Sequence, residues 1–422
     1  MTKAGGSLCR RTFLKAAGAA GLSWGFSARS ATGWEEASAL PPIRQITRGP
    51  KFHWFGYYDK LEFDPTGRFV LGMEVGFEHR SPQPDDVIKV GMVDREQNDE
   101  WIELGESRAW CWQQGCMLQW RPGSRNEVLW NDRQQDRFVC HVLNVDTRER
   151  QTLDNPIYSV SPDGRWAVSL DFRRTNETRP GYGYSGLPDP HRDVLAPRDS
   201  GIFVVDLTTG HQELAVSLAD AAAIPLPGHD FTRAKSQFEH LLINPDGTRF
   251  EFLHRWGYPT WKGETRMLTA ARDGSDVRVI DPSGKTSHFI WRDPHYILAW
   301  SWHASHNNGF YLFEDRASGT IEIVGKDVMT VNGHCTYLPG NQWILNDTYP
   351  DRQRLQHPYL YHVPTGKRVP LGHFATPAQY AGEWRCDTHP RFSPDGKWVV
   401  IDSPHSGQGR QLHLIDIGSI VG

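Results

Sequence analysis

One hairpin unit recurs along this chain: an apolar stretch, a turn built on proline, aspartate and glycine, and a second apolar stretch. It reads "YSVSPDGRWAVSLD" at 158–171 and "RFSPDGKWVVID" at 391–402, and related units make seven in all. Proline and aspartate favour the turn, glycine supplies a positive φ, and the flanking β-branched and aromatic residues favour strands. Most units are followed by a second strand pair, such as "GIFVVDLTTGHQEL". The repeats predict an all-β fold, a seven-bladed β-propeller of four-stranded blades.

Composition and charge agree with such a fold and exclude one class of partner. The chain has 422 residues, with 17 Trp, 40 Gly and 28 Pro, which favours many short strands joined by turns. The net charge is -4 with both signs interspersed. A basic stripe is therefore missing from the sequence, and we expect no nucleic-acid partner.

The N-terminus predicts export. Arg10 and Arg11 precede Phe13, Leu14 and a short mildly apolar run, a pattern typical of a twin-arginine signal peptide over residues 1–33. That run is too short to span a bilayer, so the mature protein is expected to have no membrane span and to be periplasmic or secreted. Residues 34–422 are predicted to form the propeller. A segment rich in Pro, Gly, Arg and Tyr, about 173–200, is expected to be a long loop in the third blade.

Five cysteines follow the predicted signal: Cys111, Cys116, Cys140, Cys335 and Cys386. Their spacing indicates no dense disulfide framework, although Cys111 and Cys116 fit either a bridge or a pair of buried thiols. Cys335 and Cys386 lie beside histidines and are candidate ligands. Strand alternation points Cys335 away from the channel, which favours a packed thiol at that position.

Histidine recurs at one place in the repeat, five residues before the turn proline. In a propeller this is the start of the innermost strand, at the mouth of the central channel. Imidazoles that converge from neighbouring blades suit a divalent metal, although each one could instead bond a neighbouring carbonyl. If Trp300 replaces the missing proline of the fifth blade, the seven aligned residues are Lys60, Met117, Ile157, His240, His295, His334 and His389.

Polar residues are also predicted at the ends of the second strands, on the same face as the histidines. They include His254, Arg255, Arg316 and Tyr349. A funnel of histidine, arginine, aspartate and tyrosine is typical of a site for a polar, anionic small molecule. The aspartates there fit an inter-blade structural bridge equally well. The "RPGYGYSG" stretch of the long loop is a candidate lid that stacks on a sugar.

The C-terminal half resembles the oligogalacturonate lyase family of seven-bladed propellers. The resemblance rests on "HLLINPDGTRFEFLHRWGYPTWKGETRMLTAARDG", "GHCTYLP" and "DTHPRFSPDGKWVVIDSPH". It implies a divalent cation, usually manganese, held mainly by histidines, for which His334 and His389 are the matching residues; zinc or calcium would be alternatives. It also implies that His240 and His254 are the pair associated with the catalytic base, and that Arg255 binds the substrate carboxylate. Before His389 the chain departs from the family pattern, so Glu383, Cys386 or Asp387 would complete the ligand set. The segment "FHWFGYYDK" has no counterpart in the resemblance.

These residue types suit β-elimination from a uronic acid. That reaction removes the proton at C5 and expels the substituent at C4, and it needs a cation at the carboxylate and a base near neutral pKa. The predicted metal residues are His295, His334 and His389. The predicted catalytic residues are His240 or His254 as the base, Arg255 as the carboxylate partner, and Tyr349 or Tyr58 as the donor to the leaving oxygen. The predicted substrate-binding residues are His53, Tyr58, Lys60, Arg173, Tyr182 and Arg316.

We therefore predict an exported lyase that cleaves uronic-acid-containing oligosaccharides with the help of a metal. Two other classes remain open at this stage. A glycoside hydrolase would need two carboxylates beside the scissile bond, for which the candidates are Glu74, Glu78, Asp315 and Asp402. A non-catalytic glycan-binding or scaffold propeller would need no converging histidines.

Overall fold

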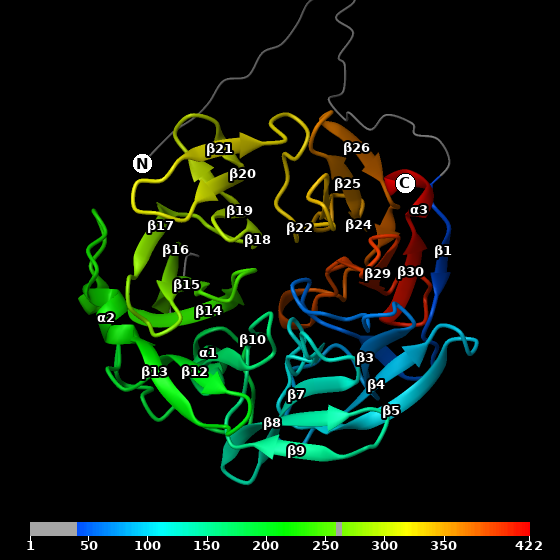
Figure 1. The fold of residues 1–422 in the computed structure, drawn as a ribbon, viewed down its shortest axis with the longest axis horizontal. Helices are drawn as coiled ribbons and strands as arrows, with labels where there is room; N and C mark the ends of the chain where they lie inside the picture. The colour runs from blue at the N-terminus through cyan, green and yellow to red at the C-terminus, as the bar shows by residue number, and fades with distance from the viewer. Residues whose placement is uncertain (1–39, 259–263) are drawn as a thin grey trace, which may run out of the picture. The chain divides into compact units, whose positions relative to one another are not determined.

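The computed structural model describes residues 40–258 and 264–422, and in that part the strands form seven four-stranded antiparallel sheets around a central axis (Figure 1). The seven-bladed β-propeller expected from the repeats is thereby confirmed. The predicted signal at residues 1–33 lies outside the described residues. No helix in the described ranges is long and apolar enough to cross a membrane.

The blades follow one another in chain order, and each begins with its innermost strand. Blade I is β2 (Phe52–Trp54), β3 (Phe69–Val75), β4 (Ile88–Asp94) and β5 (Glu100–Ser107). Blade II is β6 (Gln119–Trp120), β7 (Glu127–Gln134), β8 (Arg137–Asn144) and β9 (Arg150–Leu153). Blade III is β10 (Ser159–Val160), β11 (Trp166–Leu170), β12 (Gly201–Asp206) and β13 (Gln212–Ser217). Blade IV is β14 (Lys235–Ile243), β15 (Arg249–Tyr258), β16 (Glu264–Ala271) and β17 (Arg278–Gly284).

The last three blades complete the ring. Blade V is β18 (Phe289–Asp293), β19 (Tyr296–His303), β20 (Asn307–Glu314) and β21 (Ile321–Val324). Blade VI is β22 (Thr336–Tyr337), β23 (Trp343–Asn346), β25 (Tyr359–His362) and β26 (Lys367–Pro370). Blade VII is β28 (Arg391–Phe392), β29 (Trp398–Ser403), β30 (Gln411–Asp416) and β1 (Ile43–Gln45). A two-stranded ladder of β24 (Leu355–Gln356) and β27 (Phe374–Ala375) flanks blade VI.

The elements outside the blades are short. The α-helices are α1 (Phe172–Thr178), α2 (Leu218–Ala223) and α3 (Gly418–Val421), and two 3₁₀ turns cover Phe231–Arg233 and Gly382–Trp384. Helix α1 belongs to the connection between β11 and β12, the second and third strands of blade III. This connection runs from residue 171 to residue 200.

The proline-aspartate-glycine turns form for the reasons that the sequence suggests. In blade III, Ser161 Oγ donates to Asp163 Oδ1 at 2.5 Å, Trp166 N donates to Ser161 Oγ at 3.1 Å, and Gly164 has a φ of +68°. The same bonds recur in blade VII around Ser393, and Gly396 has a φ of +69°. Each turn returns the chain from the innermost strand to the second strand with its apolar side chains in the core between blades.

The innermost strand of blade I contains an insertion. Trp54 pairs with Met73, and the next pairing is Leu71 N donating to Glu62 O at 2.9 Å. Residues 55–61 therefore leave the sheet between two adjacent rungs of the ladder. The first six residues of this insertion, "FGYYDK", belong to the segment that had no counterpart in the family resemblance. The insertion places Tyr57 and Tyr58 beside the central histidines.

In blade V the predicted hairpin is displaced by one strand. The stretch taken as its first hairpin forms β19 and β20, which are the second and third strands, and the innermost strand is β18. His295 therefore lies in the β18–β19 turn and is exposed, and Asp315 N donates to its carbonyl at 2.7 Å. The placement of His295 at the start of an innermost strand is wrong. The proline of this turn is Pro294, and the histidine that opens β18 is His288.

Candidate active site with a metal centre

Four buried histidines from four blades meet at the channel mouth: His240 of blade IV, His288 of blade V, His334 of blade VI and His389 of blade VII. The His334 ring lies 4.2 Å from the His288 ring and 4.2 Å from the His389 ring, measured between centroids. The Tyr57 ring joins this group, because it stacks on His240 at 5.0 Å and meets His389 edge-on at 5.3 Å. Three of these histidines, His240, His334 and His389, are among the residues aligned from the sequence.

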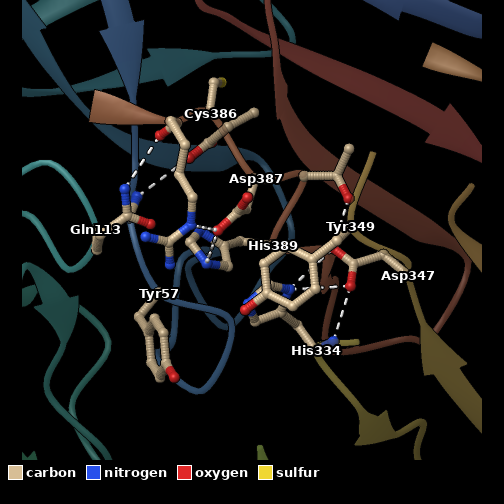
Figure 2. Close-up of polar contacts among 12 residues, drawn as sticks. Tyr57, Gln113, His334, Asp347, Tyr349, Cys386, Asp387 and His389 are labelled. Carbon is tan, nitrogen blue, oxygen red and sulfur yellow. Dashed lines mark hydrogen bonds and ion pairs between the residues drawn. The ribbon is translucent and has the colours of Figure 1, made fainter. Parts of the chain in front are cut away.

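His334, Asp387 and His389 form a group that can hold a metal ion, since one ligand atom from each lies within 4.8 Å of the others (Figure 2). All three side chains are buried. His334 Nε2, Asp387 Oδ1 and His389 Nε2 have no hydrogen-bond partner within the described part of the chain. Buried polar atoms without partners are costly, and two imidazoles with a carboxylate are a common donor set for divalent metals. These three residues therefore fit a metal ion.

Asp347 orients the first of these ligands. His334 Nδ1 donates to Asp347 Oδ1 at 2.9 Å, and the His334 backbone N donates to the same oxygen at 2.7 Å (Figure 2). Thr388 Oγ1 donates to Asp347 Oδ2 at 2.5 Å. With its proton held on Nδ1, His334 presents the lone pair of Nε2, as metal-bound histidines do. Asp347 thus also bridges blade VI to blade VII. It has both roles that the sequence left open for such aspartates, as a residue of the site and as an inter-blade bridge.

His288 is a site residue that the sequence alignment missed. Its Nδ1 lies 2.9 Å from Asn332 Oδ1, so Nδ1 carries the proton, and its Nε2 lies 3.3 Å from the Tyr349 hydroxyl. Burial first, and then the charges of His334 and Arg385, lower the pKa of His288 well below its usual value. His288 is thus a neutral imidazole whose Nε2 can accept a proton. Counting back from Pro294 instead of Trp300 would have brought the search to within one residue of His288.

His240 and His389 are held in an uncommon backbone conformation. Their φ angles are +54° and +38°, and Met117 at the equivalent place in blade II has +55°. Non-glycine residues with positive φ are strained, and such residues concentrate at functional sites. Burial, followed by Arg255 and Arg179, lowers the pKa of His240 well below its usual value. Gln114 Nε2 lies 3.1 Å from His240 Nδ1, which leaves the proton on Nε2, 3.4 Å from the Tyr57 hydroxyl.

Three arginines surround the histidines and exceed the acids that pair with them. Arg255 Nε lies 3.0 Å from Glu239 Oε2, and Arg179 pairs with the same oxygen. Arg385 Nε donates to Asp387 Oδ2 at 2.6 Å, and its Nη2 donates to the Tyr182 hydroxyl at 2.6 Å. In these described ion pairs, three guanidinium groups meet two carboxylates, a balance that suits an anionic ligand.

The tyrosines of the site keep their protons. Burial, reinforced by neighbouring tyrosines, raises the pKa of Tyr57 well above its usual value, and burial followed by Asp387 raises that of Tyr349. Tyr58 donates to Phe289 O at 2.7 Å and accepts from Phe289 N at 3.0 Å, so its hydroxyl is held by the backbone. Lys60, at the edge of the centre, is buried, and its Nζ pairs with Asp59 at 2.8 Å.

His254 lies on the other face of β15 from Arg255, because successive side chains of a strand point to opposite sides. Its Nε2 is 3.0 Å from Ser236 Oγ, and Arg266 Nε donates to its Nδ1 at 3.1 Å. Phe231 stacks on the ring at 5.2 Å. Both nitrogens have partners, and among the described residues no contact joins the ring to the histidine group, so the structure does not bring His254 and His240 together as a pair.

Three predicted substrate-binding residues also lie elsewhere. His53 is buried between Gln411, 3.0 Å from its Nδ1, and Glu74, 3.2 Å from its Nε2. Arg316 is exposed beyond β20, at the end of blade V that carries His295. Arg173 binds its neighbour Asp171 through two bonds of 2.8 Å. Arg179, six residues later in the same connection, is the arginine that reaches the centre.

The five cysteines of the propeller are all free and buried. Cys335 packs in an apolar cluster with Leu298 and Phe310. Burial raises the pKa of both Cys335 and Cys386, as expected for neutral thiols. Neither sulfur belongs to the group that fits a metal, in which Asp387 is the residue that accompanies the two histidines.

Comparisons with known proteins place the fold. No family model matches the chain, and no curated protein matches its sequence. The oligogalacturonate lyase of Vibrio parahaemolyticus aligns with a TM-score of 0.63 at 15% identity, over 89% of this chain and 93% of that one. An oligogalacturonate lyase in complex with manganese aligns equally well, with a TM-score of 0.63 at 14% identity over the same shares. A prolyl endopeptidase aligns with a TM-score of 0.51 at 9% identity, over 89% of this chain and 48% of that one. The likeness shows a shared propeller fold.

Proposed function

We propose that this protein is an exported, metal-assisted lyase that cleaves uronic-acid-containing oligosaccharides by β-elimination. One observation carries the proposal: His334 Nε2, His389 Nε2 and Asp387 Oδ1 are buried, close together and without hydrogen-bond partners among the described residues, and Arg385 lies beside them on Asp387. The manganese in the solved oligogalacturonate lyase of the same fold supports manganese as the first metal to test. Zinc and calcium are the alternatives.

His334, Asp387 and His389 would hold the ion. When bound there, a divalent cation supplies positive charge that stabilises the enolate developing at the substrate carboxylate. Arg255 and Arg179 contribute charge of the same sign from the other side of the histidine group, where both pair with Glu239. These arginines orient the carboxylate, and they make the proton at C5 more acidic by stabilising the negative charge that its removal creates.

His288 is the base in this proposal. Its Nδ1 proton is held by Asn332, its Nε2 has a lone pair, and burial keeps the ring neutral at neutral pH. A general base needs an unprotonated nitrogen within reach of the proton that it removes. In His288 this nitrogen is Nε2, and the Tyr349 hydroxyl lies 3.3 Å from it. His254, which the sequence proposed for this role, already accepts a hydrogen bond at Nδ1 and contacts Ser236 at Nε2.

Tyr57 is the proton donor to the departing oxygen at C4. Its raised pKa keeps the phenol protonated, and His240 Nε2, which carries a proton, lies 3.4 Å from the hydroxyl. The His240 proton supports the phenolate that forms during transfer, and the stacked rings keep the two groups aligned. Tyr182, whose hydroxyl is bound by Arg385, and Tyr349 lie around the same space and bind the sugar.

The glycoside hydrolase alternative is disfavoured by the partners of its candidate carboxylates. Asp402 pairs with Arg391 at 2.8 Å, and Glu78 pairs with Arg410 at 2.9 Å. Asp315 lies 2.9 Å from Arg249, and Glu74 lies 3.2 Å from His53. Each is committed to a structural pair, whereas the hydrolase needs two free carboxyl groups on either side of one bond.

The test measures product chemistry with and without metal. Purified protein is incubated with galacturonate, glucuronate and mannuronate oligosaccharides, in manganese and after chelator treatment, and the ultraviolet absorbance of the unsaturated product is followed. We expect absorbance that chelation abolishes and manganese restores. New reducing ends without absorbance would indicate hydrolysis, and no product with any substrate would indicate a binding protein. Export is tested separately, by fractionating cells that carry the chain with Arg10 and Arg11 intact or both changed to lysine.

A further inference from the structure

A cavity lies between blades II and III, lined by other residues than those of the histidine centre. Its volume is about 320 Å³, which is within the range of small-ligand sites. It is enclosed by the start of β8, the end of β11, the start of β12 and the 171–200 connection. None of the four central histidines lines it. The connection that the sequence marked as unusually long therefore builds a wall of this cavity.

The cavity combines aromatic walls with unused hydroxyl groups. Phe138 and Phe203 belong to its lining. Phe172 lies there too, but its ring stacks on Tyr184 at 4.2 Å. Ser169 and Ser200 also line it, they are 1% and 3% exposed, and neither Oγ has a hydrogen-bond partner in the described residues. Most buried hydroxyls in folded proteins are bonded, so two unpartnered ones in one wall need a reason. Each can donate one hydrogen bond and accept two after rotation about χ1, which is the capacity that a sugar hydroxyl requires.

Acidic groups outnumber basic ones among the residues that line the cavity. Arg173 forms two bonds of 2.8 Å with Asp171, and Arg137 lies 3.4 Å from Asp154. His191 lies 3.4 Å from Asp199. Four aspartates and two arginines line the cavity, so the lining has no positive excess. This is the reverse of the central site, where arginines outnumber their acids, and it disfavours a carboxylate or phosphate ligand.

We propose that this cavity is a binding site for one neutral sugar unit, such as a galactose or arabinose residue. Phe138 and Phe203 would cover the apolar face of the pyranose or furanose, and Ser169 and Ser200 would bond its hydroxyls. The site holds whether or not the central site is a lyase, since none of its residues takes part in the proposed reaction. Helix α1 connects the two places: Phe172 and Arg173 line the cavity, and Arg179 just beyond the helix pairs with Glu239.

Saturation-transfer NMR on the full chain tests this site. The probes are galactose, arabinose and glucose at millimolar concentration, with galacturonate as the charged comparison. The test variants are Ser169→Ala and Ser200→Ala, which remove unpartnered hydroxyls and should leave the fold intact. We expect at least one neutral sugar to bind, and each variant to weaken its binding by about five- to tenfold, the loss typical of one hydrogen bond.

The matched control is His334→Ala, which disables the proposed metal site and should leave neutral-sugar binding unchanged. Three results would overturn the proposal. The first is no saturation transfer to any of the neutral sugars. The second is neutral-sugar binding that both serine variants retain in full. The third is binding that His334→Ala removes, which would place the sugar at the centre instead.

Discussion

At the scale of single residues, what each buried histidine can do depends on the hydrogen-bond partners of its two ring nitrogens. His334 has Nδ1 bound to Asp347 and Nε2 without a described partner, so it is prepared to be a ligand. His288 has Nδ1 bound to Asn332 and Nε2 beside a tyrosine hydroxyl, so it is prepared to be a base. His254 has both nitrogens occupied, and its role is to pack and to pair. All three residues are histidines, so the sequence does not separate their roles. Their hydrogen-bond partners in the structure do.

Asp347→Asn tests how the metal ligand is oriented. An amide cannot stabilise the His334 Nδ1 proton as a carboxylate does, so the ligand loses basicity and orientation. We expect manganese affinity to fall by roughly 10- to 100-fold with the fold retained, measured by competition with a fluorescent chelator. The control is Asp193→Asn, at an exposed position of the long connection. Unchanged affinity in Asp347→Asn would show that the ion binds elsewhere.

Tyr57→Phe tests the proton donor. The change removes one hydroxyl and keeps the ring that stacks on His240. We expect kcat to fall by about 100-fold or more with a small change in KM, since the lost group acts on the leaving oxygen. Tyr361→Phe, in the outer part of blade VI, is the control and should keep full activity. A Tyr57→Phe enzyme with a normal kcat would remove Tyr57 from the mechanism.

His254→Ala separates packing from catalysis. The variant deprives Arg266 of one of its bonds in a buried position and removes the ring under Phe231. We expect the free energy of unfolding to fall by about 2–4 kcal/mol, and kcat per folded molecule to stay within about threefold. Urea unfolding measures the free energy of unfolding, and activity assays on the same samples measure kcat. The control is His306→Ala, at an exposed position. Loss of turnover at unchanged stability would restore His254 as a base.

At the scale of elements, a break in a regular strand makes the site. Residues 55–61 leave the innermost strand of blade I, and Asp402 holds the start of this insertion by accepting from Phe55 N at 3.3 Å and Gly56 N at 3.3 Å. The 171–200 connection of blade III also contributes to the site, since it brings Arg179 and Tyr182 to the centre. The blades supply a rigid frame, and these two irregular segments supply much of the chemistry.

Gly56→Ala tests the insertion as a unit. Gly56 has a φ of +108°, and an added Cβ would lie 2.9 Å from the carbonyl carbon of Gln114. Gly340, with a φ of +83° and open space around its Cβ position, is the matched control, because Gly340→Ala carries the φ strain alone. We expect Gly56→Ala to cost at least about 1 kcal/mol more than Gly340→Ala, and to lower kcat by displacing Tyr57. Equal costs and full activity would mean that the insertion tolerates movement.

At the scale of the whole molecule, the ring is closed by joining its two ends. Strand β1 pairs with β30, with Ile43 opposite Ile415, so the first described strand completes the last blade (Figure 1). Ile46 and Thr47 just after β1 are buried, and Leu412 N donates to Thr47 Oγ1 at 2.9 Å. This closure keeps blade VII against blade I, and with it Asp387 and His389 beside Tyr57.

Two truncations test the closure. Removal of residues 1–38 keeps β1 and should leave the melting temperature unchanged. Removal of residues 1–48 also deletes β1, Ile46 and Thr47, and should lower the melting temperature by roughly 5–10 °C, from the loss of buried apolar surface and of the strand pairing. Differential scanning fluorimetry of the two proteins decides the matter. Equal melting temperatures would show that blade VII is stable with three strands.

The sequence was sufficient where the repeat was regular. Counting five residues back from the turn proline located His240, His334 and His389 correctly, because a proline stands at the same place in the turn of blades IV, VI and VII. The count was wrong in blade V, where Trp300 replaced the proline and His295 was chosen over His288. Local spacing also cannot reveal that Arg173 binds Asp171 while Arg179 reaches Glu239, since both arginines lie in one connection.

By itself, the sequence determined the propeller, its seven blades and the concentration of histidine at one end of the channel, because turn chemistry and strand alternation are local properties that repeat. Only the tertiary structure decided which histidine nitrogens have no hydrogen-bond partner among the described residues, and which arginines pair with the same carboxylate. His334 of blade VI meets Asp387 and His389 of blade VII across a blade boundary, and the insertion of blade I reaches histidines of blades IV and VII. Such contacts depend on closing the ring, which brings together residues that are hundreds of positions apart.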